Sequence, residues 1–168
     1  VLVLVPTDAL RQQVAQKFYT LGILKDPMSV LLSDGVIRPV VGVLTKRPKT
    51  ILDLDNIFSR CNVVVTTSAL TGGCSPEVQA RMAELCSHLF IDEAHHAEAP
   101  TWKVFKAHFK SQKRAILQFT ATPFREDSRP LDGKIVYVYP MRLAQSDGYF
   151  RSIRFSSVYA FNSTRADN

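Results

Sequence analysis

Residues 89–96 read Leu-Phe-Ile-Asp-Glu-Ala-His-His, an apolar run that stops at two adjacent carboxylates. A short apolar run of this kind is typical of a strand buried in a parallel sheet, where both faces are covered. Helical patterns flank it, one starting at Ser75-Pro76 with proline at the first helical position, the other at Pro100. The second helix should bury three aromatic residues: Trp102, Phe105 and Phe109.

The alternation of apolar runs and helical patterns predicts the fold class. Further strands are expected at 1–5, 40–44, 62–66 and 115–119. Further helices are expected after a cap at Thr7 or Asp8, and over residues 50–58. Strands connected through helices pair in parallel, so we expect an α/β fold, a parallel sheet with flanking helices in three layers.

The pattern changes beyond Pro123. Residues 125–132 are polar and loop-like. After them the sequence predicts a β-rich run at 135–139, a short helix at 141–147 and an alternating strand at 153–161.

Four of the predicted strands are followed by polar residues. The clusters are Pro6-Thr7, Thr66-Thr67, Asp92-Glu93 and Thr120 to Thr122. Parallel strands all end at the same edge of a sheet, and open α/β sheets bind their ligands at that carboxyl edge. The sequence therefore predicts a ligand site built from these clusters.

Asp92 and Glu93 are the most informative pair. Carboxylates beside an apolar strand are costly to keep charged unless a cation compensates them. An aspartate with remaining water ligands suits Mg²⁺, so Asp92 could hold the metal while Glu93 activates water. A lone Asp-Glu pair is more often a surface turn or a helix start, but its place between a strand and two histidines favours the functional interpretation.

The two histidines His95 and His96 also raise the possibility of a transition-metal site. No HExxH motif is present, and His88 and His108 have unsuitable spacings for zinc. A hydrogen bond from a histidine to a nearby hydroxyl, such as that of Thr120 or Thr122, is the preferred interpretation. A metal-dependent hydrolase built on Asp92, Glu93 and the histidines remains an alternative.

The 168 residues carry a net charge of +6, distributed unevenly. Residues 1–100 hold nine basic and ten acidic side chains, whereas residues 101–168 hold twelve and five. A basic half suits an anionic partner such as nucleic acid, and a solvated basic surface is the alternative. The three cysteines match no metal spacing and suggest a reduced, cytoplasmic protein, and no apolar run approaches the roughly 20 residues of a membrane helix.

Taken in order, these segments resemble the motifs of superfamily 2 helicases and translocases, in the DEAH-containing branch near the restriction-enzyme motor subunits. "LVLVPTDALRQQ" resembles motif Ia, "VVVTTSAL" motif Ib, "LFIDEAHH" motif II and "LQFTATPFRED" motif III. The resemblance implies a first RecA-like motor domain over 1–140, followed by a segment, 141–168, leading to a second motor domain.

The resemblance also implies a role for each matching residue. Asp92 would hold the Mg²⁺ of bound ATP, and Glu93 would orient and deprotonate the attacking water. His95, Thr120 and Thr122 would couple the nucleotide to the nucleic-acid side. The sugar–phosphate backbone would be contacted by Pro6, Thr7, Thr66, Thr67 and Arg125. DNA is favoured over RNA because the resemblance is to DNA translocases.

One departure from the family pattern affects activity. No GxxxxGK(S/T) phosphate loop is present, and the chain starts on a strand-like run. We therefore expect an incomplete domain, truncated at its N-terminus before motif Ia and lacking the second RecA-like domain, with little ATPase activity in isolation. The alternative is a non-catalytic nucleic-acid-binding module derived from such a motor.

Overall fold

The computed structural model describes residues 1–25, 35–96, 100–122 and 131–149. The chain divides into two compact units, Val1–Leu131 and Asp132–Asn168. Arg125 and the strand predicted at 153–161 lie outside the described residues. The division into domains at residue 140 stays a prediction.

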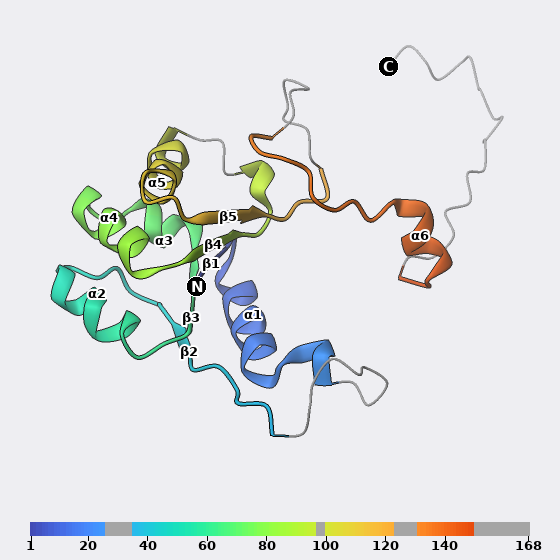
Figure 1. Cartoon of the computed structure of the whole chain (residues 1–168), viewed down its shortest axis with the longest axis horizontal. Helices are drawn as coiled ribbons and strands as arrows, with labels where there is room; N and C mark the ends of the chain where they lie inside the picture. The colour runs from blue at the N-terminus through green and yellow to red at the C-terminus, as the bar shows by residue number, and fades with distance from the viewer. Residues whose placement is uncertain (26–34, 97–99, 123–130, 150–168) are drawn as a thin grey trace, which may run out of the picture. The chain divides into compact units, whose positions relative to one another are not determined.

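The first unit is built on a five-stranded sheet in which every paired strand is parallel (Figure 1). The strand order is β2-β3-β1-β4-β5. The strands are β1 (Leu2–Val5), β2 (Val41–Val43), β3 (Val63–Thr67), β4 (His88–Ile91) and β5 (Ala115–Gln118). The helices of this unit are α1 (Asp8–Thr20), α2 (Ile51–Phe58), α3 (Ser68–Gly72), α4 (Pro76–Leu85) and α5 (Pro100–Ser111), with 3₁₀ turns η1 (Gly22–Lys25) and η2 (Ala94–His96).

Helix starts follow the capping residues in the sequence. Thr7 precedes α1, and its Oγ1 accepts a hydrogen bond from the N–H of Leu10 at 3.3 Å. Ser75 caps α4 in the same way, and Pro76 occupies the first turn, where its missing N–H leaves no bond unmade. These local signals place the turns between strand ends and helices, where the polar clusters lie.

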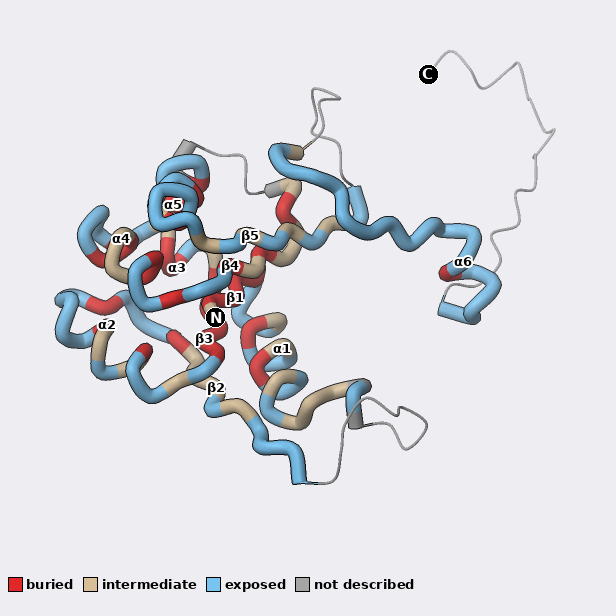
Figure 2. The backbone as a smooth tube through the Cα atoms, viewed as in Figure 1, coloured by how far each residue is buried: buried red, intermediate tan, exposed pale blue. Residues whose placement is uncertain are grey.

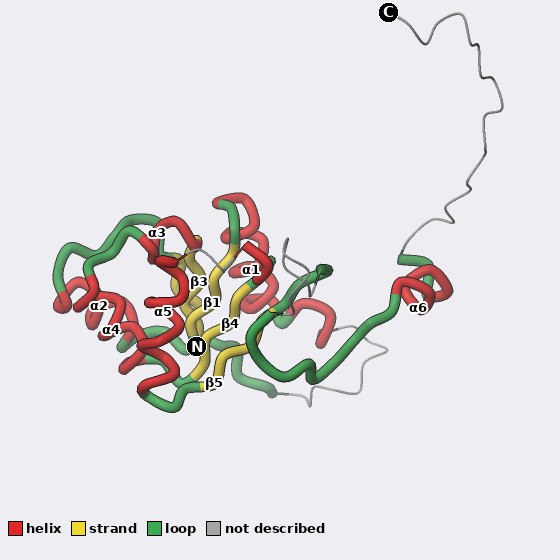
Figure 3. Tube along the Cα trace, turned by 90° about the horizontal axis from the view of Figure 1, so that it is seen from above, coloured by secondary structure: helices red, strands yellow, loops and turns green. Residues whose placement is uncertain are grey.

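Strand residues alternate between the two faces of the sheet, and each face has its own core. Leu2 and Leu4 pack into the core shared with α2, α4 and α5, whereas Val3 and Val5 pack with residues of α1. Figure 3 shows α1 on one side of the strands and α2 to α5 on the other. Figure 2 shows that β1 and β3 are buried along their length. The predicted three-layer, RecA-like α/β fold is confirmed.

The aromatic residues of α5 form part of the larger core, as predicted. Phe105 and Phe109 are fully buried, and their ring centroids lie 5.4 Å apart. Trp102 meets Phe105 edge-on at 5.9 Å. No described helix is both long enough and apolar enough to cross a lipid bilayer.

The second unit contradicts one prediction. Residues 135–139 form no strand, and their apolar side chains are exposed. A β-rich sequence becomes a strand only when a neighbouring strand satisfies its backbone N–H and C=O groups, so β propensity alone did not suffice here. The predicted helix follows as α6 (Met141–Ser146). Beside it, the Tyr139 hydroxyl donates to the Asp147 carboxylate, which raises the pKa of Tyr139 to about 12.

Candidate active site

The carboxyl ends of neighbouring strands are aligned in the sheet. Val5 of β1 lies beside Thr67 of β3, and Ile91 of β4 lies between Leu4 of β1 and Gln118 of β5. The residues that follow these positions therefore emerge along one edge. Three of the four predicted polar clusters, those after β1, β4 and β5, therefore converge at a common edge, which we call the carboxyl edge below, whereas Thr66 and Thr67 lie within the end of β3.

A strained turn carries the two carboxylates. Asp92 follows β4 directly, and its N–H donates to the Leu4 carbonyl at 2.9 Å. Glu93 has a φ of 50°, in the left-handed region that few non-glycine residues occupy. Its N–H donates to Asp92 Oδ1 at 3.0 Å, so the turn is closed by the first carboxylate. Backbone strain held in this way clusters at functional sites.

His95 connects this turn to the end of β5. Its Nδ1 lies 3.0 Å from Thr120 Oγ1 and 3.3 Å from Glu93 Oε2. The contact with Thr120 is the histidine–hydroxyl bond predicted from the sequence, whereas the contact with Glu93 was not anticipated. The coupling role assigned to His95 by resemblance stays a prediction.

Thr120 and Thr122 form a small turn of their own. Thr120 Oγ1 donates to the Thr122 carbonyl and accepts from the Thr122 N–H, both at 3.1 Å. This places the Thr120 hydroxyl in a fixed orientation toward His95. Thr122 thus joins the site through its backbone, and Glu93, His95 and Thr120 form one contiguous chain of polar contacts.

Backbone bonds hold the two turns together. The N–H of Phe119 donates to the Ile91 carbonyl at 2.9 Å, and the N–H of Ala94 donates to the Phe119 carbonyl at 3.0 Å. The turn after β4 therefore extends the ladder between β4 and β5 beyond the last paired strand residues. Relative displacement of Glu93 and Thr120 would break these bonds.

The donor set at Asp92 fits a hydrated Mg²⁺ ion. The residue is half-buried, and Oδ1 is bonded to the Glu93 N–H, which leaves Oδ2 as a hard oxygen ligand. Mg²⁺ is commonly held by one or two carboxylates, with water and phosphate oxygens completing its shell. Among the side chains that the structure describes, no group of three or more His, Cys, Asp or Glu is placed to hold a metal ion. The side chain of His96 lies outside that description.

The residues expected to contact nucleic acid are placed unequally. Thr7 is exposed and Pro6 is half-buried. Thr66 and Thr67 lie inside β3 instead of following it, and both are buried. The Thr66 hydroxyl donates to the Leu44 carbonyl at 3.3 Å. Their contact with nucleic acid therefore stays a prediction, as does that of Arg125, which lies outside the described residues.

A basic loop at the same edge escaped the sequence analysis. Lys46, Arg47 and Lys49 follow β2, whose carboxyl end lies beside that of β3. The signal was present as three cations in four residues. Acidic side chains elsewhere in residues 1–100 balance these three cations, so the net charge of that part of the chain does not reveal them.

The comparisons with known proteins agree with this geometry. The family model described as type III restriction enzyme, res subunit, matches residues 1–125, which contain all five strands and the carboxyl edge. A search of curated proteins gave no match. The parallel sheet, the acidic turn after β4 and the family match lead to one conclusion: the chain belongs to the type III restriction enzyme res subunit family, whose helicase-like domains are superfamily 2 ATPase motors.

Proposed function

We propose that this chain forms part of an ATP-driven DNA motor of a restriction system, with the acidic turn after β4 as its hydrolysis site. Asp92 would hold the Mg²⁺ of bound ATP through its carboxylate, and the ion would neutralise charge on the phosphates. Glu93 would orient the attacking water and accept its proton. Phosphoryl transfer asks a protein mainly for positioning and charge, which these two side chains can provide.

The observation that carries the proposal is the chain of contacts from Glu93 through His95 to Thr120. A change in the position of the Glu93 carboxylate, on binding or losing the γ-phosphate, would alter its contact with the imidazole. The imidazole in turn contacts Thr120, the second residue after β5. This route offers a physical means of transmitting the nucleotide state along the carboxyl edge, and we propose it as the coupling element.

The nucleic acid would lie across the same edge. Exposed Thr7 and half-buried Pro6 would contact the sugar–phosphate backbone, as would Arg125. Thr66 and Thr67, whose side chains are buried, would contribute through their main chain. Such contacts carry no sequence information, which suits a motor that moves along any sequence. We propose DNA in preference to RNA, and action in the cytoplasm.

We also propose that the domain works with a second RecA-like domain. The division predicted from the sequence assigns 1–140 to the first motor domain and 141–168 to the segment that leads to the second. ATP hydrolysis in this arrangement needs residues from both domains, so we expect the 168-residue chain to hydrolyse ATP weakly by itself.

The test compares ATP hydrolysis, with and without DNA, in the 168-residue chain and in the full-length gene product that contains it. We expect DNA-stimulated hydrolysis by the full-length protein. Glu93→Gln should lower it by about 10²–10⁴-fold, the usual contribution of a general base. Glu77→Gln, which alters an exposed carboxylate in the first turn of α4, is the matched control and should leave hydrolysis unchanged.

Three outcomes would contradict parts of the proposal. Full hydrolysis by the Glu93→Gln protein would remove the assigned base. DNA binding by the full-length protein that neither ATP nor Mg²⁺ affects, together with no hydrolysis, would favour the non-catalytic binding module. Strong hydrolysis by the 168-residue chain alone would contradict the need for a second domain.

A further inference from the structure

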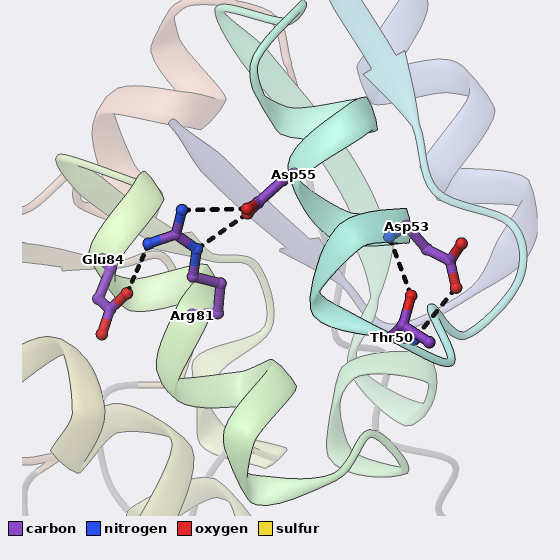
Figure 4. Close-up of polar contacts among 5 residues, drawn as sticks. All are labelled: Thr50, Asp53, Asp55, Arg81 and Glu84. Atoms are coloured by element: carbon purple, nitrogen blue, oxygen red, sulfur yellow. Dashed lines mark hydrogen bonds and ion pairs between the residues drawn. The ribbon is translucent and has the colours of Figure 1, made fainter.

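The loop after β2 is a compact basic segment held firmly at both ends. At its start, the Leu44 N–H donates to the Val65 carbonyl at 3.0 Å. At its end, Thr50 and Asp53 form a reciprocal capping box that begins α2 (Figure 4). Pro48 is buried between these anchors, whereas the three cations of the loop are exposed: Lys46, Arg47 and Lys49. We call residues 45–49 the basic loop.

Arg47 is seated against the backbone of Gly73. A Cβ atom on Gly73 would lie 2.2 Å from Arg47 Cζ and 2.4 Å from Nη2, so a larger residue here would displace the flexible end of the Arg47 side chain. The φ of Gly73 is −93°, a value that any residue adopts, so its backbone conformation does not require glycine. By contrast, a Cβ on the preceding Gly72 would meet nothing within 4 Å. The guanidinium of Arg47 therefore packs closely against Gly73 and not against Gly72.

The charge of the basic loop is only partly balanced within the described residues. Lys49 lies near Asp53, whose pKa is lowered mainly by its hydrogen bonds with Thr50, with a smaller contribution from Lys49. No ion pair of Lys46 or Arg47 occurs in the described part of the chain. Two cations at the end of a short, anchored loop are thus available to an anionic partner.

The sheet places this charge beside the proposed path of the nucleic acid. β2 pairs with β3, and β3 pairs with β1, all in parallel. The basic loop therefore extends the carboxyl edge by one strand beyond Thr67 and Thr7. An extended polyanion crossing that edge would meet exposed Thr7 on one strand and the cations of the basic loop two strands away.

We infer that the basic loop is a phosphate-binding site for DNA, in which Arg47, packed against Gly73, and Lys46 and Lys49 neutralise backbone phosphates. This inference rests on the proposed function, because it requires DNA to lie across the carboxyl edge. The site is independent of base sequence, as all phosphate contacts are.

Salt dependence gives a quantitative test. Each phosphate neutralised adds about 0.7 to the slope of log affinity against log salt for single-stranded DNA, and about 0.9 for a duplex. We would measure binding of the 168-residue chain to a fluorescent single-stranded oligonucleotide and to the matching duplex across a salt series. Arg47→Ala should lower the magnitude of the slope by about 0.7–0.9, the equivalent of one phosphate contact. The triple variant Lys46→Ala/Arg47→Ala/Lys49→Ala should lower it by roughly two to three times that amount.

Matched controls separate local binding from net charge and from folding. Arg60→Ala removes one exposed cation just before β3, at the opposite edge of the sheet, and should leave the slope unchanged. Gly73→Ala should weaken binding by displacing the flexible end of Arg47, whereas Gly72→Ala should not. Urea unfolding midpoints should be alike for the lysine and arginine variants, because every side chain that they alter is exposed.

The outcomes distinguish this inference from the proposed function. Binding that is lost equally in Arg47→Ala and Arg60→Ala would reduce the effect to net charge and overturn the basic loop as a site. Binding unchanged in the triple variant would overturn it as well, while leaving DNA binding at the carboxyl edge intact. Failure of the unaltered chain to bind either DNA at low salt would overturn both.

Discussion

His95 Nδ1 lies 3.0 Å from Thr120 Oγ1, and the direction of this hydrogen bond follows from the surrounding contacts. The single proton of the Thr120 hydroxyl is directed at the Thr122 carbonyl, 3.1 Å away. With that proton directed at the carbonyl, the hydroxyl oxygen accepts from His95, an arrangement that places the imidazole proton on Nδ1. The other neighbour of Nδ1, Glu93 Oε2, is also an acceptor, in agreement with this assignment.

The first prediction is that neutral His95 is the Nδ1–H tautomer. Long-range ¹H–¹⁵N correlation spectra of the chain above neutral pH should show Nδ1 as the protonated nitrogen, with the signal assigned by its absence in His95→Gln. Thr120→Val should perturb the His95 ring shifts because it removes an acceptor from Nδ1. A spectrum with Nε2 protonated and Nδ1 bare would contradict the geometry of the site.

A second prediction concerns the core beneath the site. Phe109 of α5 is fully buried and packs against Phe105, so Phe109→Ala would leave a large cavity. We expect a loss of about 3–5 kcal/mol in the free energy of unfolding, measured by urea denaturation. Val104→Ala on the same helix is the control, because Val104 is 55% exposed, and should change stability by less than about 0.5 kcal/mol. Similar losses for the two variants would show that α5 does not bury this face.

The fold was predictable wherever local signals agreed. Apolar runs, the caps at Thr7 and Ser75 and the aromatic spacing of α5 each predicted an element that the structure contains. The edge site followed because parallel strands carry their polar ends to one side. Within it, the His95–hydroxyl contact was predictable from the residue types alone.

The remaining features depend on which segments become neighbours. Residues 135–139 have strand composition but form no strand, since no adjacent strand pairs with them in the described chain. The strand predicted at 62–66 continues through Thr67 in β3, and the sequence does not reveal that the Thr66 side chain is buried and bonds with Leu44. The packing of Arg47 against Gly73 brings together residues that are far apart in the sequence, and only the folded position of the loop reveals it.

A third prediction concerns the ion pair that joins α2 and α4. Arg81 donates to both carboxylate oxygens of Asp55, at 2.8 and 3.1 Å, and to Glu84 at 2.8 Å (Figure 4). These hydrogen bonds, with Asp55 the larger contributor, raise the pKa of Arg81. Arg81→Ala should lower the urea midpoint more than Arg60→Ala does. Arg81→Lys should also lower it, because an ammonium group cannot bond both oxygens in the same geometry.

A double-mutant cycle isolates this contact. If Arg81 and Asp55 stabilise the chain through each other, the effects of Arg81→Ala and Asp55→Ala should not add. The coupling should decline as salt is raised, because all three side chains are about one-third to one-half exposed. Additive effects at low salt would show that the contact between Arg81 and Asp55 contributes nothing to stability beyond the effects of the separate side chains.

The fourth prediction is a loss of stability at alkaline pH that originates at Cys86. The side chain is 2% exposed, and burial raises the pKa of its thiol to about 11, whereas an unfolded cysteine titrates at about 8.5. Between these values the unfolded chain has released the proton and the folded chain has not, so stability must fall as pH rises. At about 1.4 kcal/mol per pKa unit, the full loss in the free energy of unfolding is on the order of 3 kcal/mol.

Urea unfolding under reducing conditions, from pH about 8 to about 10.5, should show most of this loss. Burial also raises the pKa of Cys74, so Cys86→Ala should flatten the curve without abolishing its slope. Parallel curves for Cys86→Ala and the unaltered chain would place the titrating group elsewhere.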